Sequence, residues 1–367
     1  MNVDYDEDVR ALMEHAHKLL DGRDAIRKAR AVLESEGATH SADLWAEIGE
    51  QGWCGVAIAP EHGGLGMGSV ASCALAEALG RSLAPIPFAS SVYGFAQAIA
   101  LAGSAEQRAR LLPDIASGRA IGTLAFAEGP GAPFAGPITT RVDGGRITGT
   151  KLPVSDGAVA DRAVVLAMTG AGPGLFVVEL GDATRTPVST IDPMRPAARI
   201  DLNDCPAEPL GQAGEGVALA TQILGRLAVP LAFEALGAAD ACLATACDYV
   251  KSRYAFGRPI GGFQAVKHRL ADIYIANEMA RSNAYYAAWA ADHDPAAFEK
   301  AAAAARIAAC DAYWVAAKET IQLHGGIGFT WEMDCHLHYR RARQLATAAG
   351  ALDWWRARLS RHLVEAA

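Results

Sequence analysis

The chain has 367 residues, of which 51% are hydrophobic and 20% are charged, and its formal net charge is −8 at pH 7. A chain of this length exceeds one ordinary hydrophobic core, so two or three subdomains are expected, and this composition excludes extensive disorder. The negative charge disfavours nucleic acid as a partner. Seven scattered cysteines without a CxxC pair favour buried thiols over disulfides, and no metal centre is predicted.

Three segments differ in their residue pattern. Residues 1–118 are rich in Ala, Leu and Glu at helical spacing and are interrupted by the irregular loop APEHGGLGMG. Residues 119–212 contain short β-branched runs and a DGG hairpin signal, whereas residues 213–367 form long, Ala-rich periodic segments. The predicted fold class is α+β, with an N-terminal helical domain, a middle antiparallel β domain and a C-terminal four-helix-bundle domain.

The start of the chain, MNVDYDEDVR, is acidic and lacks the apolar segment of a signal peptide. No run of about 18 uncharged apolar residues stands out as a membrane span. We therefore expect a cytoplasmic protein that does not enter the membrane.

The stretch from Tyr249 to Lys267 combines several residues that bind planar anions. The pattern predicts a helix ending at Arg253, a turn at Phe256-Gly257 and a new helix near Phe263 that carries Gln264. A guanidinium can pair with phosphate oxygens while an aromatic ring packs against a flat group. The alternative for these residues alone is an ordinary corner between helices with a solvated arginine.

Four stretches, taken in order, resemble the acyl-CoA dehydrogenase family over almost the whole chain. APEHGGLG is similar to the family's "P-E-x-x-G-G-x-G" loop, and LAFAEG with GTKLPVSDGAVADRAVVLA is similar to its middle-domain flavin segments. SRYAFGRPIGGFQAVKHRLADI resembles the "R-x-x-F-G-x-P-I-x-x-F-Q" signature, and IQLHGGIGF resembles "Q-x-x-G-G-x-G-[FY]". The resemblance implies the three-domain fold of that family.

The resemblance also implies an FAD-dependent enzyme that oxidises acyl-CoA thioesters and passes electrons to an electron-transfer flavoprotein. In the family a glutamate removes the α-proton while the β-hydride goes to the flavin, and FAD lies across a subunit interface. Matching positions imply that this chain contacts the neighbour's FAD through Arg253, Phe256, Gln264, Gln322, Gly325 and Gly326. Within its own middle domain, the resemblance implies that the Ser155 hydroxyl bonds the flavin.

Both usual positions of the catalytic glutamate lack an acid. The position twenty-seven residues after Gln322 holds Ala349, and the position twenty-six residues before Arg253 holds Leu227. An alkyl side chain cannot accept a proton, so no catalytic residue is assigned. Pro153 also stands where the family places a tryptophan against the flavin.

The residues that would contact a neighbour's FAD are present, whereas both positions for the catalytic glutamate lack an acid. This difference predicts a non-catalytic subunit that completes a partner's FAD pocket. The chain resembles subunits of the heteromeric α2β2 acyl-CoA dehydrogenases of bacterial steroid and bile-acid side-chain breakdown, in which a second subunit carries the catalytic glutamate. One alternative is a homo-oligomer with an atypical base, such as Glu128 or Glu234; another is an inert scaffold. Glu234 is expected to close a buried polar contact.

Charged and aromatic residues near the C-terminus are expected to have structural roles. Glu332 and Asp334 are expected to form a solvated helix start, and the Arg340-Arg341-Ala342-Arg343 cluster is expected to be solvated at the surface. The Trp354-Trp355 pair is expected to serve packing or an interface.

Overall fold

The computed structural model describes residues 5–20 and 23–365. The chain divides into two compact units, one made of Met1–Arg30, Ser69–Ala84 and Ala228–Ala367, the other of Ala31–Gly68 and Pro85–Leu227. Helices and a β-sheet appear in the order that the sequence predicts, and the α+β class is confirmed. The division into domains 1–118, 119–212 and 213–367 stays a prediction.

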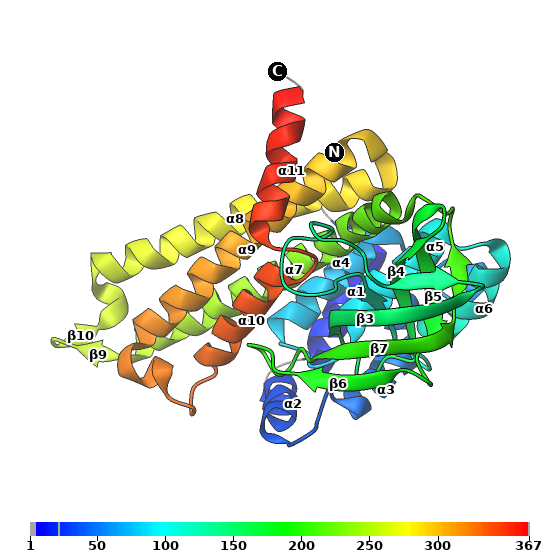
Figure 1. Cartoon of the computed structure of the whole chain (residues 1–367). Coiled ribbons are helices and arrows are strands. Elements are labelled where there is room, and N and C mark those ends of the chain that lie inside the picture. Colours follow the sequence, from blue (N-terminus) through cyan, green and yellow to red (C-terminus); the bar gives the residue numbers. More distant parts are fainter. Residues whose placement is uncertain (1–4, 21–22, 366–367) are drawn as a thin grey trace. The chain divides into compact units, whose positions relative to one another are not determined.

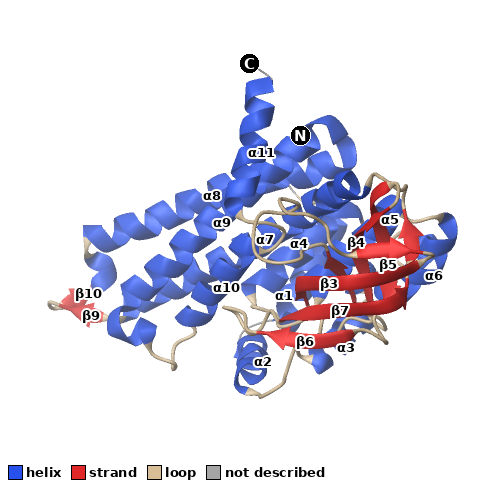
Figure 2. Cartoon of the chain, viewed as in Figure 1, coloured by secondary structure: helices blue, strands red, loops and turns tan. Residues whose placement is uncertain are grey.

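The first unit is helical (Figures 1 and 2). Its core is the long pair α8 and α9, which pack against each other, with α10 and α11 packed on α9. Most of the buried positions of α9 are alanines, which let neighbouring helices approach closely. The unit contains all or part of α1 (Glu7–Leu20), α2 (Arg23–Glu34), α4 (Gly68–Arg81), α7 (Gly216–Ser252), β9 (Tyr254–Ala255), β10 (Arg258–Pro259), η4 (Ile260–Gly262), α8 (Gln264–His293), α9 (Pro295–His324), η5 (Gly325–Phe329), α10 (Cys335–Thr347) and α11 (Leu352–Glu365).

The second unit is built on an eight-stranded sheet, drawn in red in Figure 2. The strand order is β6-β7-β3-β2-β4-β5-β8, and β1 also pairs with β4. Its elements are α3 (Ala42–Glu50), η1 (Trp53–Gly55), η2 (Pro60–His62), η3 (Ala89–Ala96), α5 (Gln97–Ala102), α6 (Ala105–Ala116), β1 (Gly122–Ala125), β2 (Arg141–Asp143), β3 (Arg146–Ser155), β4 (Arg162–Thr169), β5 (Gly172–Glu179), β6 (Thr184–Val188), β7 (Ala197–Pro206) and β8 (Glu208–Leu210).

Most strand pairs in this sheet are antiparallel, as the sequence predicts. The predicted DGG hairpin is present: Gly144 and Gly145 adopt positive φ between β2 and β3. β1 pairs with β4 in parallel, and β2 makes one parallel pairing with β4, so the sheet is mixed.

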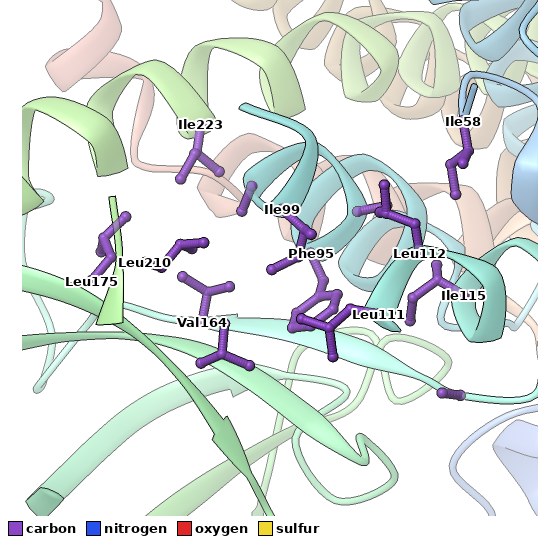
Figure 3. Close-up of a cluster of buried hydrophobic side chains, with 14 of the residues drawn as sticks. Ile58, Phe95, Ile99, Leu111, Leu112, Ile115, Val164, Leu175, Leu210 and Ile223 are labelled. Carbon is purple, nitrogen blue, oxygen red and sulfur yellow. The ribbon is translucent and has the colours of Figure 1, made fainter. Parts of the chain in front are cut away.

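Helices cover one face of the sheet and enclose its core. Phe95 of the π-helical segment η3 and Ile99 of α5 meet Val164 of β4 and Leu175 of β5 (Figure 3). Gly122 at the start of β1 lies where an added Cβ would be 2.2 Å from the Phe95 ring, so only glycine permits this approach. The close packing of η3 on β1 therefore fixes the position of β1 in the sheet.

Helix α7 is long and apolar, although Arg226, Glu234 and Asp240 divide it into shorter uncharged runs, as expected. By length and composition it could span a membrane, because its most apolar 18-residue window has a mean hydropathy of 1.6. However, 78% of that window is buried inside the protein, as in a core helix.

Candidate functional site

The predicted helix-turn-helix corner is present at one end of the helical unit. Helix α7 ends at Ser252, and the β9–β10 hairpin leads into α8, whose first residue is Gln264. The central residues of the hairpin, Phe256 and Gly257, have φ of 53° and 77°, as a type I′ turn requires. The backbone N–H of Ile260 donates to the Arg253 carbonyl at 2.8 Å and closes the hairpin onto the helix end.

Phe256 combines backbone strain with almost complete exposure. A bulky residue in the left-handed region costs about 1–2 kcal/mol, and this side chain is 95% exposed. Within the described residues, its ring forms a T-shaped pair with Phe263, at 6.2 Å between centroids. Burial of the ring within the chain does not offset the backbone strain. This favours a contact between the ring and a group from outside the chain.

Replacing Phe256 with asparagine is expected to stabilise the hairpin and weaken cofactor binding. Asparagine tolerates positive φ, and Asn-Gly is the preferred type I′ pair, so the strain of about 1 kcal/mol is relieved. Hydrogen exchange of the Arg258 and Ile260 amides in Phe256→Asn should slow, while bound FAD per assembled enzyme should fall. Slower exchange with unchanged FAD would show that the ring has no role in binding.

An open cleft lies beside the hairpin and ends at Gln322 of α9. Its volume is about 430 Å³, and Gln322 is exposed to it. Its wall is mostly apolar, which suits a flat heteroaromatic group with an amide at its edge. The lining residues are Ala255, Phe256, Ile260, Phe263, Ala265, Val266, Arg269, Gln322 and Leu323.

Gly325 and Gly326 follow directly where α9 ends at His324. Both glycines are exposed, and an added Cβ at either would meet no atom within 4 Å. Gly325 has φ of 65° and ψ of −141°, a conformation open to glycine alone. The backbone at this turn is therefore bare on its outer side and can approach a ligand closely.

Arg253 supplies the positive charge at this end of the unit. Its side chain is exposed, and within residues 5–20 and 23–365 its guanidinium has no hydrogen bond or ion pair. Gln264 is exposed on the first turn of α8. The residues predicted to contact a neighbour's FAD thus come from the ends of α7 and α9, the hairpin and the start of α8.

A small hydrophobic cluster holds these element ends together. Ala246 and Val250 of α7 pack with Leu323 of α9, and Ile260, Val266 and Leu270 pack against them. The cluster lies directly under the exposed face, so the backbone that carries the polar groups is rigid while their side chains face solvent. We call the exposed set Arg253, Phe256, Gln264, Gln322, Gly325 and Gly326 the signature face.

Ser155 belongs to the other unit. It is the last residue of β3 and is exposed, as is Pro153, whereas Val154 between them is buried. The Thr123 hydroxyl donates to the Ser155 carbonyl at 2.6 Å and fixes the end of the strand. Pro153 offers no broad aromatic surface on that face. The role of Ser155 toward a flavin stays a prediction.

The turn at Ala349 is well anchored but carries no acid. The Arg306 guanidinium donates to the Leu345 carbonyl and, at 2.7 Å, to the Ala348 carbonyl, and the Trp355 indole donates to the Ala349 carbonyl at 3.2 Å. Trp355 is buried, which confirms its predicted packing role. The role of Arg306 in holding this turn could not be predicted from sequence, because its acceptors are backbone carbonyls.

At the alternative position for a base, Leu227 is almost completely buried on α7. Neither it nor Ala349 can accept a proton from a substrate. A base in this chain would have to be another titratable side chain.

Glu128 is committed to a structural ion pair. Its carboxylate accepts from Lys151 Nζ at 2.6 Å, from the Thr139 amide at 2.7 Å and from the Thr140 amide at 3.1 Å. Burial favours the protonated acid, but these hydrogen bonds outweigh burial and lower the pKa of Glu128 to about 2. Burial lowers the pKa of Lys151, against the opposing effect of Glu128. A carboxylate with so low a pKa is a weak base at neutral pH.

Glu128→Gln is expected to destabilise the protein in a pH-dependent way. At neutral pH the change leaves Lys151 buried without its counter-charge, at a cost of about 2 kcal/mol. Because the pKa of Glu128 is depressed from 4.5 to about 2, its stabilisation is present above its ordinary pKa and is lost as pH falls through 2. The difference in urea midpoint between wild type and variant should therefore be large at pH 7 and shrink below about pH 4.5. A constant difference would contradict this assignment.

Glu234 and Arg341 form a buried ion pair in the helical unit. The Glu234 carboxylate accepts from Arg341 Nη1 at 3.3 Å, and the two side chains are 2% and 0% exposed. The expectation that Glu234 closes a buried polar contact is confirmed. The expected solvation of Arg341 is wrong, because α10 turns this residue toward the core.

The expected helix start is present, since Asp334 directly precedes α10, but the expected solvation needs a correction at Asp334. Asp334 accepts from Arg30 Nε at 2.7 Å, so it ties the η5–α10 segment to α2. Glu332 is exposed, as expected.

Comparisons with known proteins identify the class. Residues 6–119 match the family model "Acyl-CoA dehydrogenase, N-terminal domain", and residues 214–364 match "Acyl-CoA dehydrogenase, C-terminal domain". The chain is 36% identical over 317 residues to Acyl-CoA dehydrogenase IpdE2 of Mycobacterium tuberculosis, covering 85% of this chain and 84% of the relative. The chain belongs to the acyl-CoA dehydrogenase family.

Two solved structures are similar to it along nearly their whole length. A variant of the Tcur3481-Tcur3483 steroid ACAD has a TM-score of 0.87 at 33% identity and covers 98% of each chain. The ChsE4-ChsE5 complex from Mycobacterium tuberculosis has a TM-score of 0.88 at 29% identity and covers 100% of this chain and 99% of that chain.

The cofactor of this family is FAD. The signature face fits a dinucleotide, since it offers an uncommitted guanidinium, an apolar cleft and bare glycine backbone.

Proposed function

We propose that this chain is the non-catalytic, FAD-completing subunit of a heteromeric α2β2 acyl-CoA dehydrogenase whose partner subunit carries the catalytic glutamate. One observation carries the proposal: the signature face is intact and open to solvent, whereas Ala349 and Leu227 occupy both positions for the base. The commitment of Glu128 to Lys151 and of Glu234 to Arg341 supports it, since neither acid is available to a substrate.

Each residue of the signature face has a role in this proposal. Arg253 pairs with the pyrophosphate, and Gln264 and Gln322 offer amide hydrogen bonds. Phe256 packs on the flat part of the dinucleotide, while Gly325 and Gly326 let backbone approach it. Held by these residues, FAD would supply the hydride acceptor for the α,β-dehydrogenation of the acyl-CoA.

The remaining parts of the proposal concern the substrate and the electron acceptor. The likeness to the steroid ACAD supports a steroid acyl-CoA as the substrate, for which we propose a bulky steroid side-chain CoA. An electron-transfer flavoprotein would reoxidise the enzyme, in the cytoplasm. Ser155 is the hydroxyl that this chain can still offer to a flavin on its own sheet.

The test is to purify the chain alone and together with the acyl-CoA dehydrogenase encoded beside it, and to measure mass and FAD content. We expect a tetramer with one FAD per two chains, and activity that is lost when the partner's glutamate is replaced. A yellow homo-oligomer with one FAD per chain that oxidises acyl-CoA would establish the atypical-base alternative. An assembled pair whose FAD content does not depend on the signature face would establish the scaffold alternative.

A further inference from the structure

We propose that Tyr249 and His324 are positioning residues that set the separation between the two halves of the signature face. Arg253 and Phe256 follow the end of α7, whereas Gly325 and Gly326 follow the end of α9. The inference rests on the proposed function, because it assumes that both halves hold one FAD molecule.

The rings of Tyr249 and His324 form a stacked contact between the two helices. Their centroids are 4.1 Å apart and their planes differ by 23°. The Tyr249 hydroxyl also donates to the His324 carbonyl at 3.3 Å. One tyrosine therefore contacts both the ring and the backbone of the last residue of α9.

Hydrogen bonding within α9 fixes the orientation of the His324 ring. The side chain is 4% exposed, and its Nδ1 lies 2.7 Å from the Thr320 carbonyl. A carbonyl only accepts, so Nδ1 carries the proton and donates. The other nitrogen, Nε2, is buried without a hydrogen-bond partner in the part of the chain that the structure describes. The ring is thus held in one orientation in which its face, rather than Nε2, makes the contact across the helices.

The stacked pair adjoins both halves of the face without being part of it. Arg253 lies one helical turn after Tyr249, and its amide donates to the Tyr249 carbonyl at 2.9 Å. Gly325 follows His324 directly and takes the conformation that redirects the chain. A shift of either ring therefore moves the guanidinium relative to the glycine turn. Two groups that must contact one dinucleotide lose binding when their spacing changes.

A tyrosine-histidine pair elsewhere in the helical unit provides a control. Tyr313 of α9 and His338 of α10 are both buried, and their Tyr Oη and His Nδ1 atoms are 3.0 Å apart. Tyr313 precedes His324 by eleven residues, or about 16 Å along the helix. Loss of this pair should reduce stability without altering the spacing of Arg253 and Gly325.

The experiment measures FAD release on dilution of the assembled holoenzyme, by flavin fluorescence, together with its mass and its melting temperature. Tyr249→Leu removes the stack and should raise the Kd for FAD about tenfold, while the mass stays that of the wild type. Tyr249→Phe keeps the stack and should restore the Kd to within about twofold of the wild type. Tyr313→Leu should lower the melting temperature and leave the Kd unchanged.

His324→Asn provides an independent variant if Tyr249→Leu does not assemble. The asparagine amide can keep the hydrogen bond to the Thr320 carbonyl but lacks the ring, so the same tenfold loss is expected. Unchanged Kd in an assembled Tyr249→Leu or His324→Asn enzyme would overturn the inference, as would an equal rise in Tyr313→Leu. The proposed function is judged separately, by the FAD-to-chain ratio of the wild type. If the wild type is a homo-oligomer, the same Kd comparison applies to it.

Discussion

Arg253→Ala is expected to abolish FAD retention in the assembled enzyme, even though Ala349 and Leu227 stand at the family's two positions for the base. The Arg253 guanidinium makes no hydrogen bond or ion pair within the described residues. It is therefore available to pair with an anionic group from outside the chain. Two charge-assisted hydrogen bonds to phosphate together contribute about 3 kcal/mol, which corresponds to roughly 100-fold in Kd. Flavin absorbance per tetramer after gel filtration measures the effect directly.

Two control variants separate paired hydrogen bonding from general charge. Lys251→Ala removes a positive charge two residues away, from a side chain that lies 3.6 Å from Asp248, and should change FAD affinity by less than about threefold. Arg253→Lys keeps the charge but loses the planar fork, and should recover only part of the affinity. Normal FAD content in Arg253→Ala would refute the shared pocket.

The corner that carries this arginine could be predicted from sequence because its signals are local. Pro259 bars helix continuation, Phe256-Gly257 marks a turn, and α8 begins at Gln264, one residue after the predicted start. The residues of the signature face were assigned through the resemblance to the family's motifs, and their role in binding stays a prediction. The residue spacing could not predict the positive φ of Phe256. This φ shows that the exposed ring is held on a strained backbone.

Contacts between distant residues could not be predicted. Arg341 stands in a basic cluster that looks solvated, and its partner Glu234 is 107 positions away. The β1–β4 pairing joins strands on either side of a hairpin and has no local turn signal. Tyr249 and His324 had weak signals, since Tyr249 lies four residues before Arg253 and His324 directly precedes Gly325, but only the structure shows that their rings stack.

Loss of Glu234 is expected to have the largest effect on stability. Glu234→Leu leaves the Arg341 charge fully buried without its carboxylate, which costs about 3–5 kcal/mol. Glu234→Gln keeps an acceptor and should cost about half as much. The urea midpoint and the soluble yield of the assembled enzyme measure this loss.

The double variant Glu234→Leu/Arg341→Met decides between a structural and a catalytic role for Glu234. Replacing both members of a buried ion pair with apolar side chains of similar size is often neutral, so the double variant should regain most of the midpoint lost in Glu234→Leu. If Glu234 is structural, dehydrogenation should return with stability, because the partner's glutamate supplies the base. A base cannot be restored by a methionine at position 341. A double variant that is stable, retains FAD and stays inactive would therefore assign proton transfer to Glu234, and would favour the atypical-base alternative over the proposed half-site enzyme.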